Sequence, residues 1–310
     1  MQSNIHIPVL LKESINILNI NPNGVYVDAT AGMGGHSQKI LDFLDKGKLI
    51  CIDQDQFAIN QLETRFGTIK NVSIIKDNFI HIDKILKKLN VTNVDGILAD
   101  LGVSSPMFDN SDRGFSYKDS NQLDMRMDTD NKVSAWTIVN KYPLQKLINI
   151  FKKYGEAKNS KQVAFNICKY RKNKTIDTTE ELVNIIKDSI SKKFIYKAKH
   201  PAKIYFQAIR IAVNDELNNL TTFINKSTNL LNKGGILVII SYHSLEDRII
   251  KQSFNKLTSP QIPKEIPIQN IPINYELINK HPIIPTEDEI KNNHRAHSAK
   301  LRAIRKVNYV

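Results

Sequence analysis

The strongest indication of a fold lies in residues 25–36, which read Val25-Tyr-Val-Asp28-Ala-Thr-Ala-Gly32-Met-Gly34-Gly35-His36. A short β-prone run is followed there by a glycine turn and by the start of a helix. Glycines at such a turn let the backbone approach a ligand that lies across the carboxyl ends of parallel strands. A dinucleotide site and a simple tight turn both fit this pattern, so other residues have to identify the ligand.

The alternation of strand and helix continues beyond this turn. Further β-prone runs occupy residues 49–52, 72–75 and 97–99, and the first and last of them end directly before Asp53 and Asp100. Four such alternations predict an α/β fold with a parallel sheet covered on both faces. The helical stripes between the runs are Ile40, Leu41 and Leu44; Ile59, Leu62 and Phe66; and Ile82, Ile85, Leu86 and Leu89.

The rhythm changes between residues 107 and 212, where apolar residues recur at helical spacing and no comparable β-prone run appears. The apolar run at 236–240 then resumes the sheet. We therefore expect a discontinuous sheet domain, residues 1–106 and 213–310, interrupted by an all-helical insertion, residues 107–212.

The last fifty residues are expected to contain a loop and a final strand. Residues 259–285 hold six of the eleven prolines, so this segment is expected to cross the surface without regular structure. Residues 295–306 alternate apolar and basic side chains, which predicts a closing strand with a basic edge.

Composition narrows the class of protein. The net charge of +13 suits a polyanionic partner, although a general enrichment in lysine explains the charge as well. Two cysteines, Cys51 and Cys168, exclude a disulfide framework and a cysteine-based zinc site, and no other spacing indicates a metal. The sequence shows no signal peptide and no apolar run as long as a membrane span, so we expect a cytoplasmic protein.

Two acidic residues bear on the ligand of the glycine turn, and one of them, Asp28, favours S-adenosylmethionine over a dinucleotide. Asp28 would repel a pyrophosphate in a low-dielectric cleft, whereas the sulfonium and ammonium groups of S-adenosylmethionine tolerate an acid. Asp53 ends the next strand, where a carboxylate can accept hydrogen bonds from both ribose hydroxyls. NAD enzymes share such an acid, so Asp28 carries the choice. The alternative role of Asp53 is a helix N-cap before Phe57.

Phe79 follows the third β-prone run, where the adenine of such a cofactor would lie. Its ring can cover the base, while Asp77 or a backbone group takes the amine. A place in the hydrophobic core fits Phe79 equally well.

The fourth run ends in Asp100-Leu-Gly-Val-Ser104-Ser105-Pro106. Many methyltransferases that act on base amines carry an Asp/Asn/Ser-Pro-Pro-aromatic turn at this position. The lone pair of a cytosine amine is delocalised into the ring, so acceptors aimed at its hydrogens are needed to return electron density to nitrogen. Asp100, Ser104, Ser105 and Pro106 are therefore candidate catalytic residues. A loop that only caps the strand is the alternative.

His243 follows the most apolar run, in Ser241-Tyr-His243-Ser-Leu-Glu246-Asp247-Arg248. Its place at the end of a strand that would line the cleft makes it a further catalytic candidate. A histidine alone at a strand end is often structural.

Nine blocks of this sequence together resemble the RsmH (MraW) family. They are His6-Ile-Pro-Val-Leu-Leu-Lys-Glu13, Asp28-Ala-Thr-Ala-Gly-Met-Gly-Gly-His36, Asp100-Leu-Gly-Val-Ser-Ser-Pro106, Arg113-Gly-Phe-Ser116, Leu123-Asp-Met-Arg-Met-Asp128, His200-Pro-Ala202, Phe206-Gln-Ala-Ile-Arg210, Asn214-Asp-Glu-Leu217 and Ser244-Leu-Glu-Asp-Arg248. The family methylates N4 of a decoding-site cytosine in 16S rRNA.

The resemblance implies a Rossmann-like methyltransferase domain that uses S-adenosylmethionine as cofactor. It also implies an inserted all-helical domain that binds 16S rRNA within the small ribosomal subunit. By matching positions, the cofactor contacts would be Gly34, Gly35, His36, Asp53, Phe79 and Asp100, beside Asp28 and Gly32 of the glycine turn. Family members commonly have Gln where this chain has Met107, so this chain would lack a side-chain amide bond to the cofactor at that position, while a backbone contact stays open.

Two other functions stay open at this point. A DNA amino-methyltransferase would share the cofactor turn, but the Pro-Pro-aromatic signature is missing after Ser104. A non-catalytic RNA-binding protein on the same scaffold would not need an intact cofactor site. The resemblance leaves a homodimer open as well.

Overall fold

The computed structural model describes residues 8–103, 107, 113–118, 120–191, 200–259 and 273–307. The chain divides into two compact units. One contains Met1–Gly102 and Leu217–Val310, and the other contains Val103–Glu216. The second unit extends four residues further at each end than the expected insertion.

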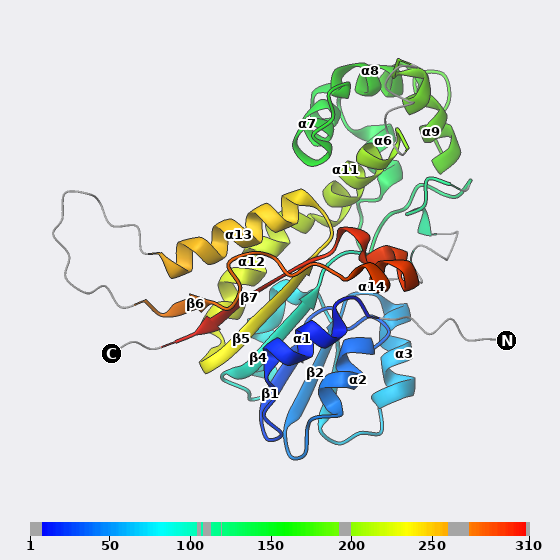
Figure 1. Cartoon of the computed structure of the whole chain (residues 1–310). Helices are drawn as coiled ribbons and strands as arrows, with labels where there is room; N and C mark the ends of the chain where they lie inside the picture. The colour runs from blue at the N-terminus through cyan, green and yellow to red at the C-terminus, as the bar shows by residue number, and fades with distance from the viewer. Residues whose placement is uncertain are drawn as a thin grey trace. The chain divides into compact units, whose positions relative to one another are not determined.

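The first unit is built on a seven-stranded sheet with the order β3-β2-β1-β4-β5-β7-β6 (Figure 1). Strands β1 to β5 pair in parallel, and β7 is antiparallel to both of its neighbours. The expected Rossmann-like parallel sheet is therefore confirmed. The strands are β1 (Val25–Asp28), β2 (Lys48–Asp53), β3 (Val72–Lys76), β4 (Val94–Asp100), β5 (Leu231–Ser241), β6 (Tyr275–Leu277) and β7 (Lys300–Lys306).

Helices cover both faces of this sheet, which explains why its strands are apolar on both sides. Neighbouring residues of one strand enter different cores: Ile97 belongs to one cluster of buried side chains and Leu98 to the other. Helices α4, α12 and α13 supply the first cluster, and α1, α2 and α3 supply the second. Their bounds are α1 (Leu11–Leu18), α2 (Gly35–Leu41), α3 (Gln56–Phe66), α4 (Ile82–Lys88), α12 (Glu216–Asn229), α13 (Ser244–Thr258) and α14 (Glu287–Asn292).

The end of the chain differs from the expectation in two ways. The prediction of a basic edge was wrong, because β7 lies between β5 and β6. Arg302 is buried there and donates from Nε to Asp247 at 2.6 Å, while Arg305 pairs with Glu276 of β6. Strand β6 lies in the segment expected to lack regular structure, of which residues 260–272 fall outside the described part of the chain.

The second unit contains the helices that the periodicity predicted, packed around a separate core. Leu147, Phe151, Leu182 and Ile186, which are among the apolar residues that recur at helical spacing in this segment, are all buried, whereas Phe165 is 54% exposed. The helices are α6 (Ala135–Lys141), α7 (Leu144–Gly155), α8 (Ser160–Tyr170), α9 (Thr179–Asp188) and α11 (Lys203–Asn214). Among the residues described, none of the helices is both long and apolar enough to span a bilayer.

Candidate functional site

The glycine turn joins β1 to α2 through backbone that favours glycine. Gly32 has a φ of 53° and Gly34 a φ of 76°, both in the left-handed region. A Cβ on Gly34 would lie 2.6 Å from Cε2 of Phe66, and one on Gly35 would lie 2.3 Å from Cγ of Pro8. The turn is thus tightly enclosed on the protein side, and substitution at either glycine would have to displace the packing around it.

Asp28 stabilises this turn through hydrogen bonds. Its side chain is buried and accepts hydrogen bonds from Ser37 Oγ at 2.6 Å and from the Thr30 N–H at 3.4 Å. Burial raises the pKa of Asp28 to about 6, although the bonds from Ser37 and Thr30 lower it. The carboxylate therefore ties the end of β1 to the first turn of α2 and fixes the shape of the loop.

Asp53 stands at the end of β2 and holds the same loop from the neighbouring strand. Its Oδ2 accepts from the Gly32 N–H at 2.8 Å and its Oδ1 from the Asp55 N–H at 2.9 Å. Burial raises the pKa of Asp53 to about 6. The alternative N-cap role was wrong, because Asp55 caps α3 by accepting from the Phe57 N–H.

Asp100 ends β4, on the other side of β1. Its Oδ1 accepts a hydrogen bond from the Tyr242 hydroxyl at 2.7 Å, and its Oδ2 lies 3.9 Å from Nδ1 of His36. Burial, together with the negative charges of Asp28 and Glu246, raises the pKa of Asp100 to about 7, while the bond from Tyr242 lowers it. The surroundings of Asp100 therefore disfavour its charged form, and the hydrogen bond from Tyr242 opposes that effect.

Other predicted cofactor residues have structural partners of their own. His36 is buried, and its Nε2 lies 3.1 Å from the carbonyl oxygen of Val9. Phe79 opens a short 3-10 turn and is partly buried, with its ring edge-on to Phe223 at 4.9 Å between centroids. The packing of Phe79 therefore agrees with the core alternative for that residue.

His243 caps the start of helix α13. Its Nδ1 accepts from the Glu246 N–H at 3.3 Å, and Glu246 Oε2 accepts from the His243 N–H at 3.2 Å. These two bonds form a capping box at the start of α13. Glu246, three residues after the N-cap, was the available signal in the sequence, but His243 is not one of the residue types that usually begin a capping box.

The carboxylates of Asp53, Asp28 and Asp100 lie at the carboxyl ends of the neighbouring strands β2, β1 and β4, in that order. The charges that raise their pKa values are those of other acids: Asp53 acts on Asp28, and Asp28 acts on Asp100. A ligand that brings positive charge would relieve this repulsion. Ser104, Ser105 and Pro106 lie outside the described residues, and Met107 is buried in the second unit.

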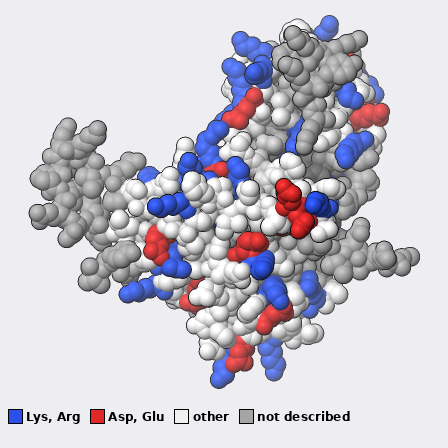
Figure 2. Space-filling model, viewed as in Figure 1, with Lys and Arg blue, Asp and Glu red and all other residues white. Residues whose placement is uncertain are grey.

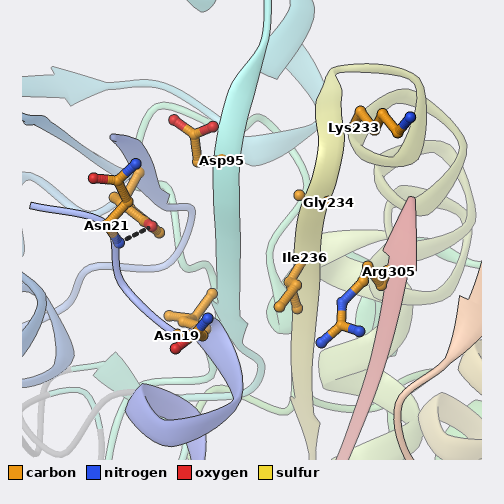
Figure 3. A pocket seen from close by; sticks show the side chains of 10 residues that line it. Asn19, Asn21, Asp95, Lys233, Gly234, Ile236 and Arg305 are labelled. Atoms are coloured by element: carbon orange, nitrogen blue, oxygen red, sulfur yellow. Dashed lines mark hydrogen bonds between the residues drawn. The ribbon is translucent and has the colours of Figure 1, made fainter. Parts of the chain in front are cut away.

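A cavity of about 420 Å³ lies at the opposite edge of the sheet (Figure 3). Tyr26 and Asp95 line it near the amino ends of β1 and β4, together with Lys233 and Ile236 of β5 and Arg305 of β7. None of the predicted site residues belongs to its lining, so it is separate from the carboxylate cluster.

Comparison with known proteins gives matches along the whole chain. Residues 3–307 match the model of the MraW methylase family. "Ribosomal RNA small subunit methyltransferase H" of Ureaplasma urealyticum is 49% identical over 305 residues, which cover 98% of this chain and 99% of the relative. The protein of the same name from Streptococcus mutans is 47% identical over 308 residues, with 97% and 98% covered. A solved putative rRNA methylase from Clostridium thermocellum aligns at 12% identity with a TM-score of 0.46, covering 98% of this chain and 100% of that one.

Proposed function

Since this chain belongs to the MraW methylase family, we propose that it transfers the methyl group of S-adenosylmethionine to the N4 amine of a cytosine at the decoding site of 16S rRNA. Relatives that are nearly half identical are named as small-subunit rRNA methyltransferases, which supports the class of substrate. The observation that carries the proposal is the cluster of Asp28, Asp53 and Asp100 around the glycine turn.

The residues at this edge of the sheet fit S-adenosylmethionine. The cofactor supplies the methyl group on a cationic sulfonium, and its ammonium adds a second positive charge. These charges match a cluster of carboxylates that are buried or partly buried. Asp53 is assigned to the ribose hydroxyls, because a carboxylate offers about four acceptor positions, more than its backbone donors occupy. Gly32, Gly34 and Gly35 let the backbone come close to the ligand, and Asp28 keeps them in place.

Asp100 is assigned to the acceptor amine. A carboxylate that accepts a hydrogen from N4 increases the electron density on nitrogen as the bond to the methyl group forms. Ser104, Ser105 and Pro106 follow it closely in the sequence and stay the proposed second group of acceptors. The capping contacts of His243 favour a supporting role for that residue.

The proposed function is tested by nucleoside analysis of 16S rRNA from cells with and without the protein. We expect N4-methylated cytidine to disappear when the gene is deleted and to return when it is restored. Loss of methylated cytosine from DNA would instead identify a DNA amino-methyltransferase. Unchanged nucleosides in both RNA and DNA would leave a non-catalytic RNA-binding role.

The helical unit is proposed to hold the RNA. On the face drawn in Figure 2, basic and acidic side chains are interspersed over both units, so charge alone does not locate the RNA-binding surface. Within α8 and the following turn, Arg171 donates to the carbonyl oxygens of Val139 and Tyr142, and Lys174 pairs with Glu181 at 2.6 Å. Lys169 and Lys172 are exposed beside them and are the better candidates for binding phosphates.

Replacing Lys169 and Lys172 together by Glu is expected to weaken binding of 16S rRNA. The log–log slope of affinity against salt concentration should become shallower by about one for each phosphate that the protein no longer neutralises. Cofactor binding should stay unchanged. The matched control is Lys87→Glu with Lys88→Glu, which alters the charge equally at an exposed helix end of the sheet unit. Equal effects of both pairs, measured by filter binding over a range of salt, would contradict a specific RNA site on α8.

A further inference from the structure

Tyr242 contacts the carboxylate of Asp100, the residue proposed to polarise the acceptor amine. It directly follows β5, and its hydroxyl donates to Asp100 Oδ1 at 2.7 Å. The phenol ring lies against Gly102, where an added Cβ would meet Cδ2 of Tyr242 at 3.3 Å. The Tyr242 N–H donates to Glu246 Oε2 at 2.9 Å, so the capping box of α13 fixes the backbone that carries the ring.

We propose that Tyr242 is a positioning residue for methyl transfer: its hydroxyl holds the Asp100 carboxylate in one orientation and in its charged form, and leaves Oδ2 to receive the amine hydrogen. This inference rests on the proposed role of Asp100. Tyr242 itself touches neither the cofactor nor the acceptor in this assignment, because it acts through the carboxylate.

The charges around Asp100 explain why such a donor matters. Asp28 on β1 and Glu246 on α13 disfavour a further negative charge, and burial disfavours it more strongly. Tyr242 opposes them, since a phenol O–H that donates to a carboxylate stabilises the ionised form. Burial, Asp100, Glu246 and Glu289 of α14 all raise the pKa of Tyr242 well above its usual value, so the phenol keeps its proton.

His36 of α2 is the other titratable group that faces Asp100, at 3.9 Å. Its Nε2 lies within hydrogen-bond distance of the carbonyl oxygen of Val9, an acceptor that needs a proton on that nitrogen. Nδ1, which lies toward Asp100, is too distant for a good hydrogen bond. Tyr242 is therefore the closest described side-chain donor to the Asp100 carboxylate, and its removal should change both the orientation and the proton affinity of that group.

The test is Tyr242→Phe, which removes the hydroxyl and keeps the ring against Gly102. Losing a hydrogen bond to a charged group should move the acid limb of the pH–rate profile for single-turnover transfer upward by about one to two pH units. The matched control is Tyr26→Phe on β1, whose hydroxyl accepts from the Asn21 N–H at 2.7 Å at the far edge of the sheet. That variant should leave the profile in place.

A second measurement does not depend on activity. In protein labelled with carbon-13 at its aspartate carboxyl groups, the Asp100 resonance is identified by its loss in Asp100→Asn, and its titration midpoint should rise in Tyr242→Phe by the same amount. If the midpoints of the resonance and of the rate are both unchanged in Tyr242→Phe, and Asp100→Asn still transfers the methyl group slowly, the inference is overturned. Normal transfer by Asp100→Asn would instead refute the role of Asp100, and the inference with it.

Discussion

Replacement of Asp100 by Asn is expected to slow methyl transfer by on the order of 10²-fold or more, in the range found when positioned polar groups are removed from active sites. The amide keeps the shape of the side chain and can still accept the hydrogen bond from Tyr242. It has no negative charge and half of the acceptor capacity, so it polarises the amine less in the transition state. Affinity for RNA should change little.

Single-turnover transfer of a labelled methyl group to 16S rRNA, run beside calorimetry of cofactor binding, separates the possible outcomes. Asp95→Asn is the matched control, because Asp95 lies on the same strand but accepts from the Val25 N–H at the opposite edge. Near-normal transfer by Asp100→Asn would move the catalytic role to Ser104, Ser105 and Pro106. A variant that loses only cofactor affinity would make Asp100 a binding residue.

Replacement of Gly34 by Ala should have the largest effect on the cofactor turn. An alanine in the left-handed region costs about 1–2 kcal/mol and overpacking about 1–3 kcal/mol, or roughly 2–5 kcal/mol together. The clash is with Phe66 and Leu62, which are both buried in α3. Because Gly34 is the N-cap of α2, the strain would also displace the turn that is proposed to face the cofactor.

The matched control is Gly234→Ala in β5. Gly234 has a φ of 80°, but no atom lies within 4 Å of an added Cβ, so only the backbone strain is introduced there. We expect Gly34→Ala to lower the thermal unfolding midpoint more than Gly234→Ala. We also expect it to weaken S-adenosylmethionine binding about tenfold or more, the equivalent of one hydrogen bond to a charged group. Equal midpoints and equal affinities would show that the packing at Gly34 has no role in the turn.

The periodicity of apolar residues was sufficient to predict those strands and helices that are set by the local sequence. The runs before Asp53 and Asp100 became strands, and the stripe containing Leu147 and Phe151 became α7. The place of β7 was not predictable in this way, because alternating apolar and basic residues are typical of an edge strand. Arg302 is buried only because Asp247, on a helix far away in the sequence, compensates its charge.

In the candidate site, residues at strand ends could be predicted from the sequence, whereas contacts between distant segments could not. Asp53 and Asp100 could be found because they end strands, and the ends of neighbouring parallel strands meet at one edge. Tyr242 was not identified, since its hydrogen bond to Asp100 joins the end of β4 to the residue after β5, and the helical unit separates these two strands in sequence. His243 was predicted to be catalytic because it follows a strand that would line the cleft. Its N-cap geometry could not be seen from that position alone.

The position of β7 has a consequence for biosynthesis. Strand β5 pairs with β4 on one side, and on the other side its backbone groups pair with residues 300–306. While a ribosome is still adding the segment between them, β5 has an open and very apolar edge, which is a template for pairing with other chains. The sheet closes only after Lys306 has left the exit tunnel, so chains that stall before that point should be the ones that aggregate or require a chaperone.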